Sequence, residues 1–301
     1  MINFSFIIPH KNIPSLLKRC LDSIPNRPDV EIIVVDDCSN AESIRELKKL
    51  SRQGLRIIFT TEKKGAGFAR NIGIKHAQGK WLFFADADDF YETNIKQFLN
   101  DYVNANVDCI YFSVSSVDSD TLEKSFRNFF YDEYINKFDP SIPHSEDWIM
   151  FNKWEPWNKM ISRDFILRNH LKFEEISKCN DMIFSLMVSL HVKKFSILKQ
   201  KLYCVTFCKN SMTFHKTTIR EFRDCINAFK RKNIILNIIN RPEWKENIQN
   251  QHSFFLKKEG RIHYLKCYLF YLLSYAYDWL KLKTFNNTIN DCLSAILPPK
   301  T

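Results

Sequence analysis

Three aspartates follow a short apolar run in the first third of the chain. The run covers 81–85 and has the length of a buried strand, and Asp86, Asp88 and Asp89 come directly after it. Carboxylates this close together repel one another, and a low-dielectric setting raises the cost. A divalent cation removes the conflict, because hard metals take oxygen ligands. The spacing therefore predicts a site for a divalent cation at the carboxyl end of a strand.

The elements that must position this cluster can be predicted from the hydrophobic pattern. Strands are expected at 4–8, 31–35, 55–59 and 81–85. We expect Pro9 to end the first strand, and apolar residues at helical spacing predict a helix in each interval, the last over 66–77. Four strands that alternate with three helices predict βαβ units and a mainly parallel sheet.

A second acidic pair, Asp36 and Asp37, ends the second strand. Ligands of parallel sheets bind beyond the carboxyl ends of the strands, so both acidic groups are expected at one edge. The turn over 65–67 precedes a helix whose N-terminus suits an anion, and Arg70 lies one turn inside that helix. Arg70 also stands where a dinucleotide-binding loop would carry its last glycine, which weakens that interpretation.

The remaining sequence predicts a C-terminal helical part with a different charge. Further strands are expected at 109–114, 195–198 and 201–207, and an apolar helix at 182–190. Beyond Thr217 the pattern is helical, so we expect a domain over 1–215 and an extension over 216–301. From 201 onward there are 17 lysines and arginines against 7 acids, which supplies the whole net charge of +10. The aromatic and basic residues of 264–283 predict either contact with an anionic membrane or a helix packed on the first domain.

Composition indicates a cytoplasmic protein. The nine cysteines form no Cys-x-x-Cys pair, as expected for free thiols in a reducing compartment. The N-terminal apolar run is too short for a signal peptide, and the longest apolar stretch, near 267–277, falls short of the roughly 20 residues that span a bilayer. We therefore expect a cytoplasmic location, with the inner face of the cytoplasmic membrane as the place of any lipid contact.

Taken in order, the motifs resemble those of the family 2 glycosyltransferases of the GT-A fold. Three motifs are specific to this pattern: Asp36-Asp37-Cys38-Ser39, Gly65-Ala66-Gly67-Phe68-Ala69-Arg70-Asn71-Ile72-Gly73 and Asp86-Ala87-Asp88-Asp89. Weaker similarity to bacterial enzymes that build surface polysaccharides lies in Pro156-Trp157-Asn158-Lys159, Asn180-Asp181 and Asn210-Ser211-Met212-Thr213. The resemblance covers about 3–215. It implies an α/β GT-A fold, with a Rossmann-like, mainly parallel sheet flanked by helices.

The resemblance also implies an activity and site residues. The activity would be inverting, metal-dependent sugar transfer from a nucleotide sugar, UDP-linked, to a glycan or lipid-linked glycan acceptor in capsule, O-antigen or lipooligosaccharide synthesis. Asp88 would be the ligand of Mn²⁺ or Mg²⁺, which neutralises the diphosphate leaving group. Asp86 would face the ribose, and Asp37, with Asp36 beside it, would read the uracil edge. The nucleotide-sugar site would also include Pro9 and Arg70, which would lie near the base and phosphates.

The reaction needs a base, because the attacking hydroxyl must lose a proton, and inversion needs only one such carboxylate. Asp181 resembles the family's base, although an aspartate at a helix start can also be a cap. The family usually has Glu-Asp here, whereas this chain has Asn180, so a role of that glutamate cannot be carried over. Trp157 is expected either on the acceptor side or in the core.

Two other functional classes remain open from the residues alone. A sugar-phosphate nucleotidyltransferase also binds a nucleotide and Mg²⁺ through carboxylates, but its glycine-rich first turn is missing from Pro9-His10-Lys11-Asn12. A non-catalytic membrane or nucleic-acid binder would use the C-terminal charge and leave the acidic cluster unexplained. Nucleic acid is therefore not expected as a partner.

Overall fold

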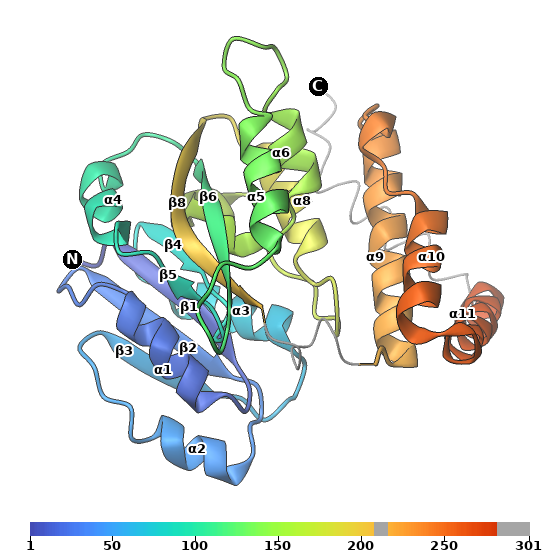
Figure 1. Cartoon of the computed structure of the whole chain (residues 1–301), viewed down its shortest axis with the longest axis horizontal. Coiled ribbons are helices and arrows are strands. Elements are labelled where there is room, and N and C mark those ends of the chain that lie inside the picture. Colours follow the sequence, from blue (N-terminus) through green and yellow to red (C-terminus); the bar gives the residue numbers. More distant parts are fainter. Residues whose placement is uncertain (208–215, 282–301) are drawn as a thin grey trace. The chain divides into compact units, whose positions relative to one another are not determined.

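The computed structural model describes residues 1–207 and 216–281. The chain divides into two compact units, and their described parts are 1–207 with Ala228–Glu246 and Lys216–Asn227 with 247–281. Figure 1 shows the strands and most of the helices of the first unit and the helices of the second. The division expected from the sequence, at 215/216, stays a prediction.

One mixed sheet organises the first unit. Its strands in the described residues are β1 (Phe4–His10), β2 (Val30–Asp36), β3 (Leu55–Phe59), β4 (Trp81–Phe84), β5 (Phe90–Tyr91), β6 (Cys109–Asp118), β7 (Lys159–Ser162) and β8 (Phe195–Phe207). They lie in the order β3-β2-β1-β4-β7-β6-β8-β5. The first four pair in parallel, and β7 is antiparallel to both β4 and β6. The α/β fold class expected from the sequence is confirmed.

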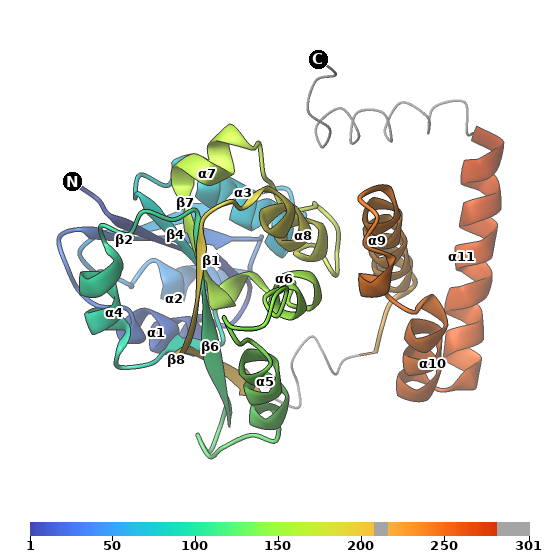
Figure 2. The same ribbon diagram turned by 90° about the horizontal axis from the view of Figure 1, so that it is seen from above.

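Helices cover both faces of this sheet (Figure 2). One face carries α1 (Pro14–Ser23), α2 (Ala41–Leu47) and α4 (Ile95–Tyr102). The other carries α3 (Ala66–His76), α6 (Asp147–Asn152), α7 (Arg163–Arg168) and α8 (Met182–His191). Because both faces are covered, β2 and β4 are buried along their whole length, which explains why they are nearly continuous apolar runs in the sequence.

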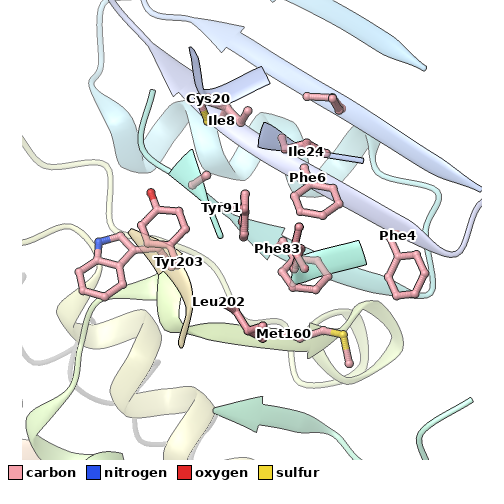
Figure 3. Packing of buried hydrophobic residues seen from close by; sticks show 14 of the residues in the cluster. Phe4, Phe6, Ile8, Cys20, Ile24, Phe83, Tyr91, Met160, Leu202 and Tyr203 are labelled. Carbon is pink, nitrogen blue, oxygen red and sulfur yellow. The ribbon is translucent and has the colours of Figure 1, made fainter. Parts of the chain in front are cut away.

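Aromatic packing fixes the centre of the first face (Figure 3). The rings of Phe6 and Phe83 stack across β1 and β4 with centroids 4.7 Å apart, and Tyr91 meets Phe6 edge-on at 5.1 Å. Tyr203 of β8 packs edge-on against Tyr91 at 5.1 Å. These contacts connect β4, which the three aspartates follow, to β8 near the far edge of the sheet.

Two expectations about the strands are wrong. Pro9 does not end β1, which continues to His10, because β4 pairs with β1 only as far as Ile7 and the missing N–H of Pro9 lies beyond that pairing. The segments expected as separate strands at 195–198 and 201–207 form the single strand β8, which keeps pairing with β6 through a register shift beside Ser113.

The second unit is helical, as the sequence predicts. α9 (Ile219–Ile238) contributes its first residues to it, followed by α10 (Ile248–Glu259) and α11 (Arg261–Lys281). Phe222 lies at its centre and packs edge-on against Phe255 and Tyr271. No helix in the described part of the chain combines the length and the apolar character needed to span a bilayer.

A buried carboxylate connects β1, β2 and the turn before β4. Glu31 is 8% exposed, and its Oε1 accepts hydrogen bonds from Ser5 Oγ at 2.6 Å, Gln78 N at 2.5 Å and Gly79 N at 3.2 Å. The interaction holds the amino ends of the strands whose carboxyl ends carry the acidic motifs.

We expect Glu31→Ala to lower the free energy of unfolding by about 2–4 kcal/mol, because it leaves buried donors without an acceptor. Urea unfolding followed by circular dichroism measures this. Glu46→Ala is the control, since Glu46 pairs with Lys49 on the surface and its loss should cost less than about 1 kcal/mol. Equal effects of the two substitutions would contradict the structural role of Glu31.

Candidate active site

The three aspartates after β4 have different partners. Asp89 is buried, and its carboxylate accepts hydrogen bonds from Thr206 N at 2.7 Å and Tyr203 Oη at 2.9 Å. The same tyrosine oxygen accepts the backbone N–H of Asp86 at 2.8 Å. Tyr203 therefore holds the acidic loop at both ends, and Asp89 is part of its support.

Asp86 and Asp88 are the aspartates that face the site. Asp86 Oδ1 lies 2.5 Å from Nη2 of Arg70, so its charge already has a partner. The Asp88 carboxylate forms no side-chain ion pair with any described residue, and burial together with the nearby Asp86 charge raises its pKa to about 6. A divalent cation fits here, because Asp88 offers a carboxylate without an ion-pair partner among the described residues and a second carboxylate lies beside it.

Arg19 holds the backbone of the same loop. Its guanidinium donates to the carbonyl oxygens of Asp88 at 2.6 Å and Ser119 at 2.8 Å, and its charge lowers the pKa of Asp88. Sequence reasoning missed both Arg19 and Tyr203. Nothing in the local pattern marks them, since their partners lie 69 to 117 residues away in the chain.

The acidic pair after β2 divides into two roles. Asp36 is 1% exposed, and its carboxylate is engaged by His10 Nδ1 at 2.8 Å, Ser39 Oγ at 2.5 Å and Ser39 N at 3.0 Å. Asp37 accepts from Lys11 Nζ at 3.1 Å, while its Oδ1 is buried with no hydrogen-bond partner among the described residues. Asp37 is therefore the member of the pair that keeps an unpaired acceptor, a buried oxygen.

The sheet brings both acidic groups to one edge. β1 lies between β2 and β4 and is parallel to each, so Asp37 and Asp86 follow the same ends of their strands. Neighbouring strands are about 4.8 Å apart, which separates the two groups by roughly 10 Å along this edge. Pro9 lies near the end of the strand between them and is partly exposed.

Arg70 joins the strand-end aspartates to the second half of the domain. It lies on α3, is 5% exposed, and donates from Nη2 to Asp86 and from Nη1 to Asn180 Oδ1 at 2.9 Å. Phe173 lies against its guanidinium, 5.3 Å from the ring centroid. Arg70 and Asn180 are 110 residues apart in the chain, so the arginine fixes the predicted base region beside the acidic loop.

Asp181 occupies the N-cap position of α8, yet its side chain makes no capping hydrogen bond. The carboxylate is not used for the alternative role, that of a helix cap. Its pKa is raised to about 6, chiefly by burial and further by the charges of Glu155 and Asp86, while Arg70 opposes the shift. A carboxylate that titrates near neutral pH is suited to accept a proton.

A buried lysine orders the loop that faces Asp181. Lys159 is fully buried, and its Nζ donates to the Lys153 carbonyl at 3.2 Å, the Glu155 carbonyl at 2.5 Å and Asn158 Oδ1 at 2.8 Å. Burial lowers the pKa of Lys159 to about 8. The Pro-Trp-Asn-Lys motif is thus explained by a structural task, to close the loop before β7.

Trp157 lies behind the acidic loop. It is 7% exposed, stacks on Tyr203 with centroids 5.5 Å apart, and meets Tyr131 edge-on at 5.9 Å. These contacts make it a support of Tyr203. Its acceptor-side role stays a prediction.

Two other features lie apart from these residues. His144, Glu146 and Asp147 could together approach a metal, but Asp147 Oδ2 is paired with Arg241 Nη2 at 2.7 Å. A hollow of about 880 Å³ opens at the opposite edge of the sheet, where β4 begins, and no predicted site residue lines it. Neither feature competes with the strand-end cluster.

Comparison with known proteins gives the family. The profile described as "Glycosyl transferase family 2" matches residues 5–166, more than half of the chain. The chain belongs to this family. Among curated relatives, the uncharacterized glycosyltransferase EpsJ of Bacillus subtilis is 25% identical over 69% of this chain and 62% of its own length. The poly(ribitol-phosphate) beta-N-acetylglucosaminyltransferase TarS of Staphylococcus aureus is 22% identical over 67% of this chain.

The family 2 chain spans 62% of EpsJ and 35% of TarS, so it covers only part of these relatives. Solved structures agree on the fold. The crystal structure of S. aureus TarS 1–349 has a TM-score of 0.66 at 18% identity, with 90% of this chain and 79% of that chain covered. Its complex with UDP-GlcNAc has a TM-score of 0.63, covering 85% and 71%. A Pyrobaculum calidifontis mannosyltransferase with GDP-Man and Mn²⁺ has a TM-score of 0.52, covering 76% and 63%.

We expect Tyr203→Phe to weaken Mn²⁺-dependent nucleotide binding at least tenfold while the fold is kept. The ring and its packing remain, but the hydrogen bonds to Asp86 N and Asp89 are lost, so the acidic loop is less ordered. Titration calorimetry with UDP and Mn²⁺ measures the change. Tyr102→Phe, on α4, is the control and should bind as the unaltered protein does.

Proposed function

We propose that this protein is an inverting, metal-dependent glycosyltransferase that moves a sugar from a UDP-sugar to a hydroxyl of a glycan acceptor. The observation that carries the proposal is the arrangement at one sheet edge of Asp37, the Asp86–Asp88 pair and Asp181, with Arg70 between the last two. The relatives support the donor class, since TarS has been solved with UDP-GlcNAc. Capsule, O-antigen or lipooligosaccharide synthesis is the proposed setting, with a glycan or lipid-linked glycan as acceptor.

Each residue has a task set by its geometry. Asp37 offers its unpartnered oxygen to an N–H of the base, and Asp86, held by Arg70, lies on the ribose side. Asp88 would hold Mn²⁺ or Mg²⁺, which supplies Lewis-acid neutralisation of the diphosphate. Asp181 takes the proton of the attacking hydroxyl as the new glycosidic bond forms and the bond to the diphosphate breaks. One base of this kind supports inversion.

The decisive experiment separates binding from transfer. Wild-type protein should bind UDP in a Mn²⁺-dependent manner and release UDP from one donor of a panel of UDP-hexoses and GDP-mannose when glycoside acceptors are present. Asp88→Asn should lose the Mn²⁺ dependence of binding. Asp181→Asn should keep UDP binding but lose transfer by at least a hundredfold, because the general base is gone.

The melting temperature provides the control for both variants. A folded-state pKa raised above the unfolded value makes the ionised carboxylate unfavourable to the fold at neutral pH, so each substitution should raise the melting temperature at pH 7. A stable Asp181→Asn variant with full turnover would contradict its role as the base. UDP binding by the wild type that ignores Mn²⁺ would contradict the metal site.

The pH dependence tests Asp181 further. The base must be ionised, so at saturating Mn²⁺ we expect kcat/KM to rise through about pH 6 and to level off above it. Arg70→Gln removes a charge that lowers the pKa of Asp181, and the rise should move to higher pH. Steady-state rates between pH 5 and 8 measure both midpoints, and a flat wild-type profile would contradict the assignment.

A further inference from the structure

The second unit exposes an aliphatic helix face. On α11, Ile262, Leu265, Leu269 and Leu272 are 76%, 51%, 57% and 44% exposed. Their spacing of three, four and three residues places them in one stripe along the helix. Amphipathic helices of globular proteins normally bury such a stripe, so its exposure calls for an occupant.

An adjacent face of α11 already has its partners within the unit. Tyr264 and Tyr271 pack edge-on against Phe222 of α9, and Tyr268 meets His252 of α10 edge-on at 5.2 Å. Figure 2 shows α10 and α11 as neighbours. The tyrosine face therefore holds the unit together, and the aliphatic face is exposed to a partner outside the unit.

The charges around the stripe have one sign. Within 247–272 the exposed charged side chains are Lys257, Arg261 and Lys266. The one acid of that range, Glu259, is 5% exposed at its side chain and is engaged by Thr217 Oγ1 at 2.5 Å and Lys258 Nζ at 3.3 Å. The surface thus combines exposed leucines with cations that have no exposed acid beside them within 247–272.

We propose that the aliphatic face of α11 binds the surface of an anionic lipid bilayer. The leucine and isoleucine side chains would enter the acyl boundary, and Arg261 and Lys266 would pair with lipid phosphates. A second copy of the same face fits less well, because two stripes that meet would bring like-charged rims together. The helix would lie along the membrane, since no described helix can cross it.

Vesicle co-sedimentation of the full chain tests the proposal. Binding is expected to phosphatidylcholine vesicles that contain a quarter phosphatidylglycerol, with at least tenfold weaker binding to pure phosphatidylcholine. The double variant L265E/L269E should lose at least tenfold in the partition coefficient. Added salt should weaken the binding of the wild type to anionic vesicles. R261E/K266E should lose this salt-sensitive binding. The matched control is L122E/L167E, which changes two exposed leucines of the first unit and should bind normally.

Circular dichroism melting must show that L265E/L269E is folded, and UDP binding reports the first unit separately. The proposal is independent of the proposed function, because vesicle binding requires no donor or acceptor. Equal binding by L265E/L269E and the wild type would overturn it. So would the absence of vesicle binding together with a wild-type oligomer that L265E/L269E dissociates, since a second copy would then be the occupant.

Discussion

Crowding of negative charge at one sheet edge is the constraint on which the site depends. The protein stabilises each aspartate differently. Tyr203 donates a hydrogen bond to Asp89, Arg70 forms an ion pair with Asp86, and Asp88 has no ion-pair partner among the described residues and a pKa raised to about 6. The interactions of Tyr203 and Arg70 fix the acidic loop. The buried charge of Asp88 is unfavourable, and a cation would stabilise it. A metal ion with its diphosphate would therefore supply the partner that this carboxylate lacks.

Arg70 connects the acidic loop after β4 to the region of the proposed base. It donates to Asp86 and to Asn180, and its charge also lowers the pKa of Asp181. An amide at position 180 orients the guanidinium without adding charge. A glutamate there, which family 2 enzymes usually carry, would add a negative charge next to Asp181 and raise its pKa further. The amide at 180 therefore keeps the pKa of the proposed base lower than a glutamate would, so that Asp181 is ionised at neutral pH.

The sequence predicts most of the sheet because strands covered on both faces are nearly continuous apolar runs, as with β2 and β4. It fails where pairing, and not composition, decides: Pro9 continues β1 because its missing N–H lies beyond the end of β4. The same limit applies to the site. The residue types single out Asp36 and Asp37, but only the structure shows that His10 and Ser39 engage Asp36 and that Asp37 keeps an unpaired oxygen. No local sequence pattern marks Tyr203.

The second unit shows the same distinction between pattern and partner. The helical pattern beyond Thr217 predicts α11, yet it does not say which face is buried, since rings and leucines are both apolar. Phe222 and His252 decide the matter, because their edge-on contacts select the tyrosine face and leave Ile262 and its stripe exposed. Charge follows the same division. The first unit gathers aspartates at one sheet edge, and Arg70 and Tyr203 stabilise only two of them, whereas the second unit engages Glu259 internally and leaves its cations at the surface. The local charge differs in sign: clustered carboxylates at the sheet edge of the first unit suit a divalent cation, and exposed cations along α11 of the second suit an anionic surface.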